Sequence, residues 1–355
     1  MSTTWPTSSV SPRWSVMQPE VAVLREPLLA LWRRNLPTAA EHRFEWLYAS
    51  GRARAWTLGE NGAALTGAAG LMLRRLSVHG TLVDSGGAID LNVDQAQRSV
   101  GPALTLVRAI TDAADADQCP VLFGMPNRAA TMVMKRAGYR ELGEFSSWTK
   151  LLRSERKVRQ VLGSLWAAKL AAPVTDLALK FQSREWTSPL PRSVITESPT
   201  GFDQRFNRLW EQAAGSFDVI GERTADYLHW RFASCPDLDY RIFTLAERSS
   251  GDLLGYVVWW DDGEQVGHAD LAAVDEPTTL LLLAEFSRHA RRLRATAISF
   301  GCFAPPWFYQ LLRASGFHHR ANRHPVLCRW LDASTPAGRD SSAWYLTKAD
   351  CDTDV

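Results

Sequence analysis

Cysteine is scarce in this chain and forms none of the close pairs that metal and redox sites use. The five cysteines are scattered, and no Cys-x-x-Cys pair occurs. Their odd number argues against a complete disulfide framework, and their spacing argues against a zinc site. We therefore predict a protein of the reducing cytoplasm and assign no metal site, although Asp350 and Asp352 near the end of the sequence could bind a metal ion.

The chain also lacks a strong net charge and a long apolar run. Lysine and arginine number 40 and acidic residues 38, so the formal net charge is +2, which gives no reason to expect a nucleic-acid partner. The longest apolar runs, Thr279–Ala284 and Leu253–Trp260, are too short to span a bilayer. The first 13 residues carry no basic-then-apolar signal pattern, and we expect a flexible tail over 1–19.

The length and composition of the chain suit a globular protein of two or three domains. The 355 residues are 46% hydrophobic and 22% charged. In the first half, the apolar periodicity predicts helices, antiparallel strands and then alternating helices and strands. Helices are expected over 22–36, 44–48, 103–116 and 127–137, and strands over 55–58, 67–76, 81–83, 88–93, 121–125 and, as a pair, 139–152.

The second half repeats the pattern of the first. Phe44–Tyr48 is echoed by Leu228–Phe232, and Ala88–Asp94 is echoed by Ala269–Asp275. Helix, strand and helix segments then come in the same order, which predicts a tandem repeat. The expected divisions are two units at 20–152 and 201–333, a linker at 153–200 and a C-terminal tail at 334–355.

The linker begins with a basic amphipathic segment. Val158, Leu162 and Leu165 recur among several arginines and lysines, and prolines from Pro173 onward interrupt the rest of the linker. Two interpretations stay open. The segment is either a helix packed across both units or a weak contact with a membrane surface or an acidic partner.

A turn between an apolar strand and a helix is the most informative stretch of the first unit. The strand ends at Val93, and the turn carries Arg98, Gly101 and Ala103 in the spacing Arg-x-x-Gly-x-Ala. The first amides of a helix have no internal partner, and the helix dipole places partial positive charge there. A basic, glycine-containing turn at this place suits a phosphate group. The alternative is a plain strand–loop–helix joint with a surface arginine.

This spacing and the element order resemble the GNAT superfamily of acyl-CoA-dependent N-acyltransferases over residues 20–152. The resemblance implies a mixed α/β sheet, with acetyl-CoA or another acyl-CoA as co-substrate. It assigns Val93 to the strand that pairs with the pantetheine arm. Asn127, which begins the following helix, either contacts the coenzyme or only caps the helix.

Pro102 has no N–H, which removes one phosphate donor from the turn. The pyrophosphate contacts implied by the resemblance are Arg98, Ser99, Val100, Gly101, Pro102 and Ala103.

Acyl transfer to an amine needs a base for the amine and a proton for the leaving thiolate. Many GNAT enzymes use a strand carboxylate for the first task and a helix tyrosine for the second. By this resemblance Asp90 is the first candidate base and Asp84 the second, although either could instead bind a turn amide. The tyrosine position holds Met134, which cannot donate a proton. The domain therefore uses another donor or binds CoA without turnover.

The second unit departs further from the family pattern. It has Asp275-Glu276-Pro277 where the phosphate turn would stand. Two acids without a glycine would repel a pyrophosphate, so we predict tandem GNAT-like domains of which the second is degenerate. The segment Trp344–Asp352 resembles the closing segment of bacterial tandem-GNAT proteins associated with exopolysaccharide clusters.

Together these features predict an acyl-CoA-dependent N-acyltransferase that acts on a small-molecule amine, such as an amino sugar or a cell-surface polysaccharide precursor. Two other hypotheses stay open. Met134 suggests a non-catalytic CoA-binding or scaffold protein. The alternative of an aminoacyl-tRNA-dependent ligase of the two-lobed GNAT-like type would use the linker arginines and Arg291, Arg292 and Arg294 as phosphate contacts.

Overall fold

The computed structural model describes residues 14–36, 41–59, 65–154, 185, 187–331 and 344–352. Of the flexible tail predicted over 1–19, residues 1–13 lie outside these residues, whereas Ser15–Met17 form a strand that pairs with Thr57–Gly59. The amphipathic segment predicted around Val158–Leu165 also lies outside them. Within the described ranges, no helix combines the length and the apolar composition that a membrane span requires.

The first half is an antiparallel meander followed by alternating helices and strands. Buried residues of its helices recur on one face, as Leu24, Leu28 and Leu31 do in α1, so each helix covers the sheet with an apolar stripe. In chain order the elements are β1 (Ser15–Met17), α1 (Val21–Asn35), α2 (Glu41–Phe44), the π-helical turn η1 (Glu45–Ala49), β2 (Ala53–Gly59), β3 (Gly67–Val78), β4 (Thr81–Val93), the 3-10 turn η2 (Gln95–Gln97), α3 (Val100–Ala116), β5 (Val121–Gly124), α4 (Arg128–Arg136) and β6 (Arg140–Leu151).

The second half contains a similar succession of elements. They are β7 (Val194–Glu197), α7 (Gln204–Ala213), η3 (Ala214–Ser216), β8 (Val219–Gly221), α8 (Ala225–Leu228), the π-helical turn η4 (His229–Ala233), β9 (Arg241–Glu247), β10 (Leu253–Asp261), β11 (Gln265–Ala273), α9 (Glu276–Arg292), β12 (Ala297–Phe303), α10 (Pro306–Ala314), β13 (His318–Trp330), β14 (Trp344–Thr347) and η6 (Lys348–Asp350).

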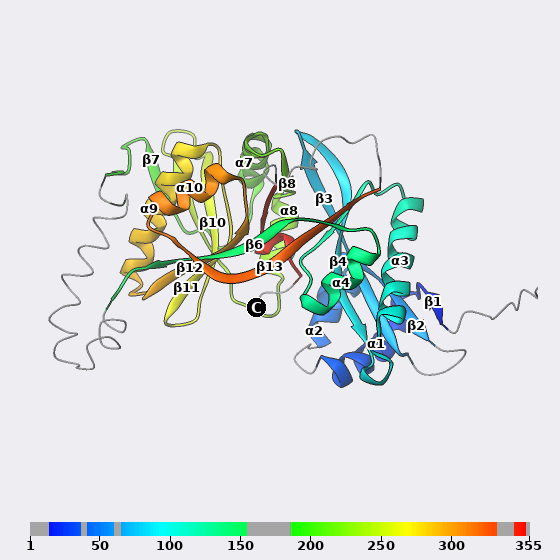
Figure 1. Cartoon of the computed structure of the whole chain (residues 1–355). Helices are drawn as coiled ribbons and strands as arrows, with labels where there is room; N and C mark the ends of the chain where they lie inside the picture. The colour runs from blue at the N-terminus through cyan, green and yellow to red at the C-terminus, as the bar shows by residue number, and fades with distance from the viewer. Residues whose placement is uncertain are drawn as a thin grey trace, which may run out of the picture.

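One sheet joins the two halves, and the halves exchange their closing strands. The main order of the described strands is β1-β2-β3-β4-β5-β13-β6-β12-β11-β10-β9-β7. Strand β13 of the second half pairs with β5, and β6 of the first half pairs with β12. Strands β6 and β13 also pair with each other, and Figure 1 shows them side by side across the middle of the molecule.

Two strand predictions are wrong in detail. The strand pair predicted over 139–152 is a single strand, β6, whose partners come from the second half. The two strands predicted at 81–83 and 88–93 are one strand, β4, which runs through Gly86 and Gly87. A Cβ on Gly86 would clash with Leu71 Cδ1 and lie 2.8 Å from Leu122 Cδ2. Glycine here therefore lets two core leucines pack against the backbone rather than turning the chain.

Strands β4 and β5 separate after a short parallel contact. Ser85–Gly87 pair with Val121–Phe123, and the described pairing between the two strands stops there. In the same region the β3–β4 register shifts between Ala68 and Gly70. Opposite this bulge Asp90 has a φ of +52°, a left-handed conformation that is uncommon for residues other than glycine. Such local strain is often retained where it positions a functional side chain.

In the second half, the gap between the corresponding parallel strands is filled by the C-terminal strand. Strands β11 and β12 are paired in parallel only as far as His268 and Phe300. Beyond that point β14 pairs with β12. Tyr345 Oη donates a hydrogen bond to the carbonyl of Leu271 in β11 at 2.6 Å. The C-terminal strand thus bridges the gap that stays open in the first half.

The two halves share a core at their π-helical turns. The rings of Trp46 in η1 and Trp230 in η4 stack with centroids 5.1 Å apart. Each indole N–H donates to the backbone carbonyl of the other tryptophan at 3.0 Å. Because buried indole N–H groups need a partner, this reciprocal contact fixes how the halves meet.

Candidate active site

The predicted phosphate turn is an exposed loop that leads into α3. Arg98 and Ser99 are exposed, and the Ser99 side chain does not cap the helix that starts at Val100. Among the described residues the Arg98 guanidinium has no hydrogen bond or ion pair. A Cβ on Gly101 would meet only Ser99 Oγ, at 4.0 Å. The first amides of α3 are therefore open to an external anion, and a free arginine lies beside them.

The matching helix of the second half satisfies its own N-terminus. Asp275 precedes α9, and its Oδ1 accepts a hydrogen bond from the Thr278 amide at 2.8 Å. Glu276 adds a second carboxylate in the first turn. These groups neutralise the partial positive charge at this helix end. The start of α9 is therefore a weaker anion-binding site than the start of α3.

A cavity of about 330 Å³ opens where β4 and β5 part. Strands of the first half form one side, and the residues around η6 form another. From Ile89, at the cavity, to Val93, before the phosphate turn, β4 rises about 13 Å. The cavity and the turn therefore lie at opposite ends of one strand segment, which pairs with β3 but whose edge towards β5 is unpaired among the described residues. The lining residues are Met72, Gly87, Ala88, Ile89, Phe123, Gly124, Met125, Asn127, Phe145, His324, Lys348, Asp350, Cys351 and Asp352.

Two carboxylates share one arginine beside this cavity. Arg43 Nη2 donates to Asp90 Oδ1 at 2.8 Å and to Asp352 Oδ2 at 2.6 Å. Tyr48 Oη donates to the other oxygen of Asp90 at 2.7 Å. The Asp90 side chain is 7% exposed and that of Asp352 is 20% exposed. Asp352 lines the cavity, whereas Asp90 lies behind it and is held at both oxygens.

Local backbone structure explains how these side chains meet. The π-helical turn η1 directly succeeds α2 and holds Tyr48. A Cβ on Gly70 would clash with Tyr48 Oη, so glycine in β3 leaves room for the phenol to pass over the strand to Asp90. The left-handed backbone of Asp90 then presents its carboxylate to Tyr48 and Arg43.

The electrostatics of the cluster keep a proton on the phenol and raise the pKa of Asp352. Burial raises the pKa of Tyr48 well above its ordinary value, and the Asp90 carboxylate raises it further. Burial also raises the pKa of Asp352. Arg43 opposes that rise and Asp90 adds to it. Tyr48 is therefore a hydrogen-bond donor, and Asp352 is a carboxylate with heightened proton affinity.

The other sequence-predicted residues take different places. Asp84 is exposed near the start of β4 and does not line this cavity. Met134 is buried in the core, with its Cε packed near Gly124. Asn127 both lines the cavity and caps α4, because its Oδ1 accepts from the Ala130 amide at 3.0 Å.

Replacing Asn127 with alanine is expected to lower the free energy of unfolding by about 1 kcal/mol, because the Ala130 amide loses its acceptor. Urea denaturation measures the change. The control Asn127→Ser restores an N-cap oxygen and is expected to recover most of the loss. Equal free energies of unfolding for the wild type and Asn127→Ala would show that this cap does not stabilise the protein.

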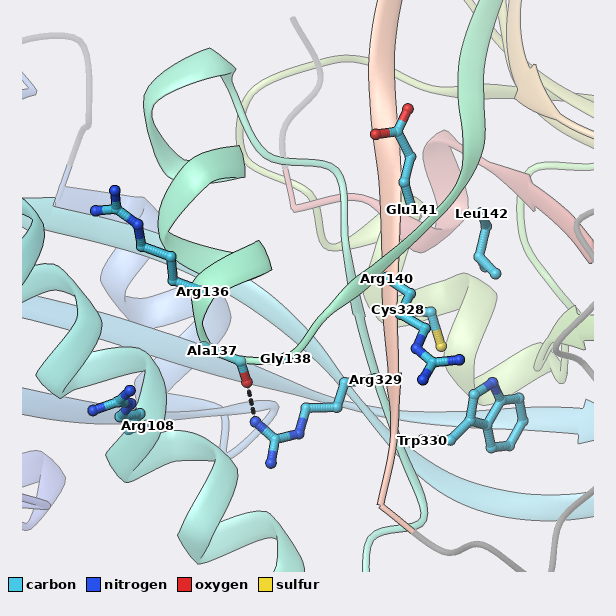
Figure 2. A pocket seen from close by; sticks show the side chains of 10 residues that line it. All are labelled: Arg108, Arg136, Ala137, Gly138, Arg140, Glu141, Leu142, Cys328, Arg329 and Trp330. Atoms are coloured by element: carbon cyan, nitrogen blue, oxygen red, sulfur yellow. Dashed lines mark hydrogen bonds between the residues drawn. The ribbon is translucent and has the colours of Figure 1, made fainter.

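A separate cavity of about 590 Å³ lies at the C-terminal end of α4. Four arginines line it: Arg108, Arg136, Arg140 and Arg329. Figure 2 shows their side chains pointing in different directions, with Arg329 reaching from β13 to donate to the carbonyl of Ala137. Among the described residues that line it, Glu141 is the only acidic one, and it is paired with Lys135 at 2.6 Å. The described lining therefore contains no unpaired carboxylate.

A broader cavity of about 900 Å³ adjoins the carboxylate-lined one. The two share Asn127 and His324. Two carboxylates, Glu141 and Glu144, line the outer cavity, and among the described lining residues Arg128 is the one arginine or lysine. A molecule larger than the inner cavity therefore has space outside it.

The C-terminal segment is anchored by a buried ionic network. The Asp350 carboxylate accepts from Arg74 Nη2 at 2.6 Å and from Arg223 Nη2 at 2.5 Å. Arg223 also pairs with Asp270 of β11 at 2.8 Å. All four side chains are at most 1% exposed. Although burial alone would raise it, Arg223 and Arg74 hold the pKa of Asp350 below its ordinary value.

Sequence reasoning missed Arg43, Tyr48 and the role of Asp352. A signal for Tyr48 was present in the repeat, because its counterpart in the second half is Phe232. The hydroxyl of Tyr48, which Phe232 lacks, indicates that the two π-helical turns differ in chemistry. No local pattern indicates that Asp352 reaches Asp90, since 261 intervening residues separate the two in the chain.

Solved structures resemble this fold over nearly its whole length. A GCN5-related N-acetyltransferase from Anabaena variabilis ATCC 29413 matches with a TM-score of 0.65 over 91% of this chain and 74% of its own, at 11% identity. The GCN5-related N-acetyltransferase from Kribbella flavida matches with a TM-score of 0.61 over 91% and 72%, at 16% identity. This chain has the GNAT fold. The predicted fold class is therefore confirmed at that level.

Two further neighbours extend the GNAT comparison. A conserved protein of unknown function from Enterococcus faecalis V583, described as a probable N-acyltransferase, matches with a TM-score of 0.66 over 91% of this chain and 73% of its own, at 12% identity. Saccharomyces cerevisiae N-myristoyltransferase with bound myristoyl-CoA matches with a TM-score of 0.55 over 93% and 85%, at 11% identity. No protein-family model matches the chain, and no curated protein matches it.

Proposed function

We propose that this chain is an acyl-CoA-dependent N-acyltransferase of the cytoplasm. Its acceptor would be an amine, such as an amino sugar or a cell-surface polysaccharide precursor, and its acyl group would be acetyl in the simplest case. The observation that carries the proposal is the segment of β4 whose edge towards β5 is unpaired in the described part of the chain. It has an open, basic helix start at one end and a carboxylate-lined cavity at the other.

The residues at the open helix start fit a coenzyme A molecule. Arg98 and the amides of Ser99, Val100, Gly101 and Ala103 would bind the pyrophosphate, while Pro102 shapes the first turn without donating. The open edge of β4 up to Val93, on the side towards β5, would pair with the pantetheine arm. The thioester would then lie in the cavity near Asn127 and the carboxylates.

We further propose that the chain is a tandem pair of GNAT-like units, 20–152 and 201–333, of which the second has lost its CoA site. Its helix start is capped by Asp275, and its strand gap is filled by β14. The order of the strands on each side of β6 and β13 supports this interpretation. The ranges predicted as linker, 153–200, and tail, 334–355, also contain β7 and β14, which are strands of the sheet, and the residues after β14 would carry part of the site.

Coenzyme binding is tested by thermal denaturation with acetyl-CoA. A ligand that binds only the folded state at about 100 times its Kd stabilises the protein by about 2.7 kcal/mol, so the melting temperature is expected to rise. ATP, an adenine nucleotide without a pantetheine arm, is the control and should shift it less. The absence of a shift with either CoA or acetyl-CoA at millimolar concentration would contradict the proposal.

A second candidate, a protein that binds CoA without turnover, is favoured by one observation. Met134 is buried at the position where the family resemblance implies a tyrosine acid. Release of free thiol from acetyl-CoA on addition of a primary amine would exclude this candidate. Coenzyme binding without thiol release would support it.

A further inference from the structure

The C-terminal segment runs from the closed gap of the second half to the open cavity of the first. Strand β14 occupies the gap, and η6 and the two residues after it reach the cavity beside β4. In Figure 1 this segment, drawn in red, lies between the halves. The buried pairing of Asp350 with Arg74 and Arg223 sets its position. Asp352 is therefore held in place two residues beyond a rigid anchor.

Asp352 differs from Asp90 in what its carboxylate can still do. Both oxygens of Asp90 accept hydrogen bonds from protein side chains, at 2.7 and 2.8 Å. Asp352 receives its side-chain bond from Arg43 on Oδ2 and lines the cavity with a fifth of its side chain exposed. Asp90 thus positions Arg43, while Asp352 presents a carboxylate to whatever enters the cavity.

The charges directly beside Asp352 favour a cation. When both carboxylates are ionised, Asp90, Asp352 and Arg43 carry one net negative charge, and Asp350 is neutralised by its arginines. Lys348 also lines the cavity and balances this charge over the cavity as a whole, but its ammonium lies over the Trp260 ring, 4.3 Å from its centroid. A small cationic group next to Asp352 would compensate the local negative charge.

We infer that this cavity is the acceptor site, that it takes primary amines in their protonated form, and that Asp352 receives the proton that must leave before acyl transfer. The inference rests on the proposed acyltransferase function and names its acceptor class. The body of a larger amine would lie in the adjoining outer cavity, past Asn127 and His324.

Two protons leave the amine nitrogen during acyl transfer. The ammonium transfers the first proton to the Asp352 carboxylate, and the freed nitrogen lone pair attacks the thioester carbonyl carbon. A C–N bond forms and the C–S bond breaks. The sulfur leaves with the C–S electron pair and takes the second proton from the nitrogen, which gives an amide and a free thiol. Asp352 then releases its proton to water, so one proton is produced in each turnover.

The surroundings of Asp352 suit this task. Burial raises its pKa, Asp90 on β4 raises it further and Arg43 on α2 lowers it. Tyr48 and Cys351 also face it, and the latter is on its own segment. His324, Lys348 and Asp350 line the same cavity. A base with a raised pKa loses its proton at a higher pH than an ordinary aspartate, so activity should rise with pH through that higher range.

The test uses the full chain with acetyl-CoA and three primary amines as probes: methylamine, glucosamine and lysine. Free-thiol release is measured against pH for the wild type and for Asp352→Asn, which keeps an acceptor for Arg43. We expect kcat to fall about 10²–10⁴-fold and the rising limb of the pH profile to disappear. The melting-temperature shift with acetyl-CoA should stay unchanged. Asp115→Asn, an exposed carboxylate on α3, is the control and should behave as the wild type.

The outcomes separate the two proposals. Loss of the acetyl-CoA shift in the wild type would count against the proposed function itself. An intact shift without thiol release from any probe amine would favour the second candidate and count against acyl transfer itself. Thiol release with wild-type rates and an unchanged pH profile in Asp352→Asn would leave acyl transfer intact and overturn the assignment of the acceptor site and of Asp352.

Discussion

Replacing Asp350 with alanine is expected to lower the free energy of unfolding by about 3–5 kcal/mol. The substitution removes the carboxylate that pairs with Arg74 and Arg223, two guanidinium groups that are at most 1% exposed. Removing one partner of a buried ion pair leaves an uncompensated charge in a region of low dielectric. The Thr347 amide also loses its acceptor, Asp350 Oδ2 at 3.0 Å. The loss would release the segment that closes the second half and carries Asp352.

Urea denaturation of Asp350→Ala and of a matched exposed pair measures this effect. Asp226 pairs with Arg52 at 2.7 Å, but its side chain is 81% exposed. Because exposed ion pairs contribute at most about 1 kcal/mol, Asp226→Ala should remain close to the wild type. If both variants lose the same small amount, the buried network does not anchor the C-terminal segment.

Gly101→Glu is expected to abolish the thermal stabilisation by acetyl-CoA while leaving the apo protein as stable as the wild type. The added carboxylate would lie at the open start of α3, where we place the pyrophosphate, and would repel it. It should not strain the fold, because a Cβ at Gly101 has space and a carboxylate near a helix N-terminus is favourable. At about 100 times the wild-type Kd, the expected loss is the whole stabilisation of about 2.7 kcal/mol.

Gly215→Glu provides the control for this variant. Gly215 is also exposed, and a Cβ there would meet no atom within 4 Å. It lies in η3 of the second half, remote in sequence from the phosphate turn, so the acetyl-CoA shift should persist. An undiminished shift in Gly101→Glu would place the coenzyme away from the α3 turn.

Much of the fold can be predicted from the sequence because its determinants are local. Apolar periodicity predicts the helices α1, α3 and α4, and the strand–turn–helix context of Arg98 and Gly101 predicts an exposed helix start. The GNAT fold is confirmed by the structural neighbours. The assignment of residues to coenzyme contacts remains a prediction, because it rests on the resemblance and on the geometry of the turn.

The parts that sequence could not predict depend on long-range contacts. Nothing local distinguishes a closing strand that returns to its own half from one that crosses, so the exchange of β6 and β13 has no signature in the sequence. Gly86 resembles a turn residue in sequence, but the packing of Leu71 and Leu122 requires it inside a strand. The carboxylate pair of Asp90 and Asp352 forms only because the C-terminal segment closes one gap and extends to the other.

The location of the coenzyme is tested most directly by a crystal structure of the full chain with acetyl-CoA. We predict one molecule per chain, with its pyrophosphate on the first amides of α3 and its acetyl group in the cavity beside Asp352. Coenzyme bound at the start of α9 or in the arginine-lined cavity of Figure 2, with the α3 turn empty, would contradict this prediction.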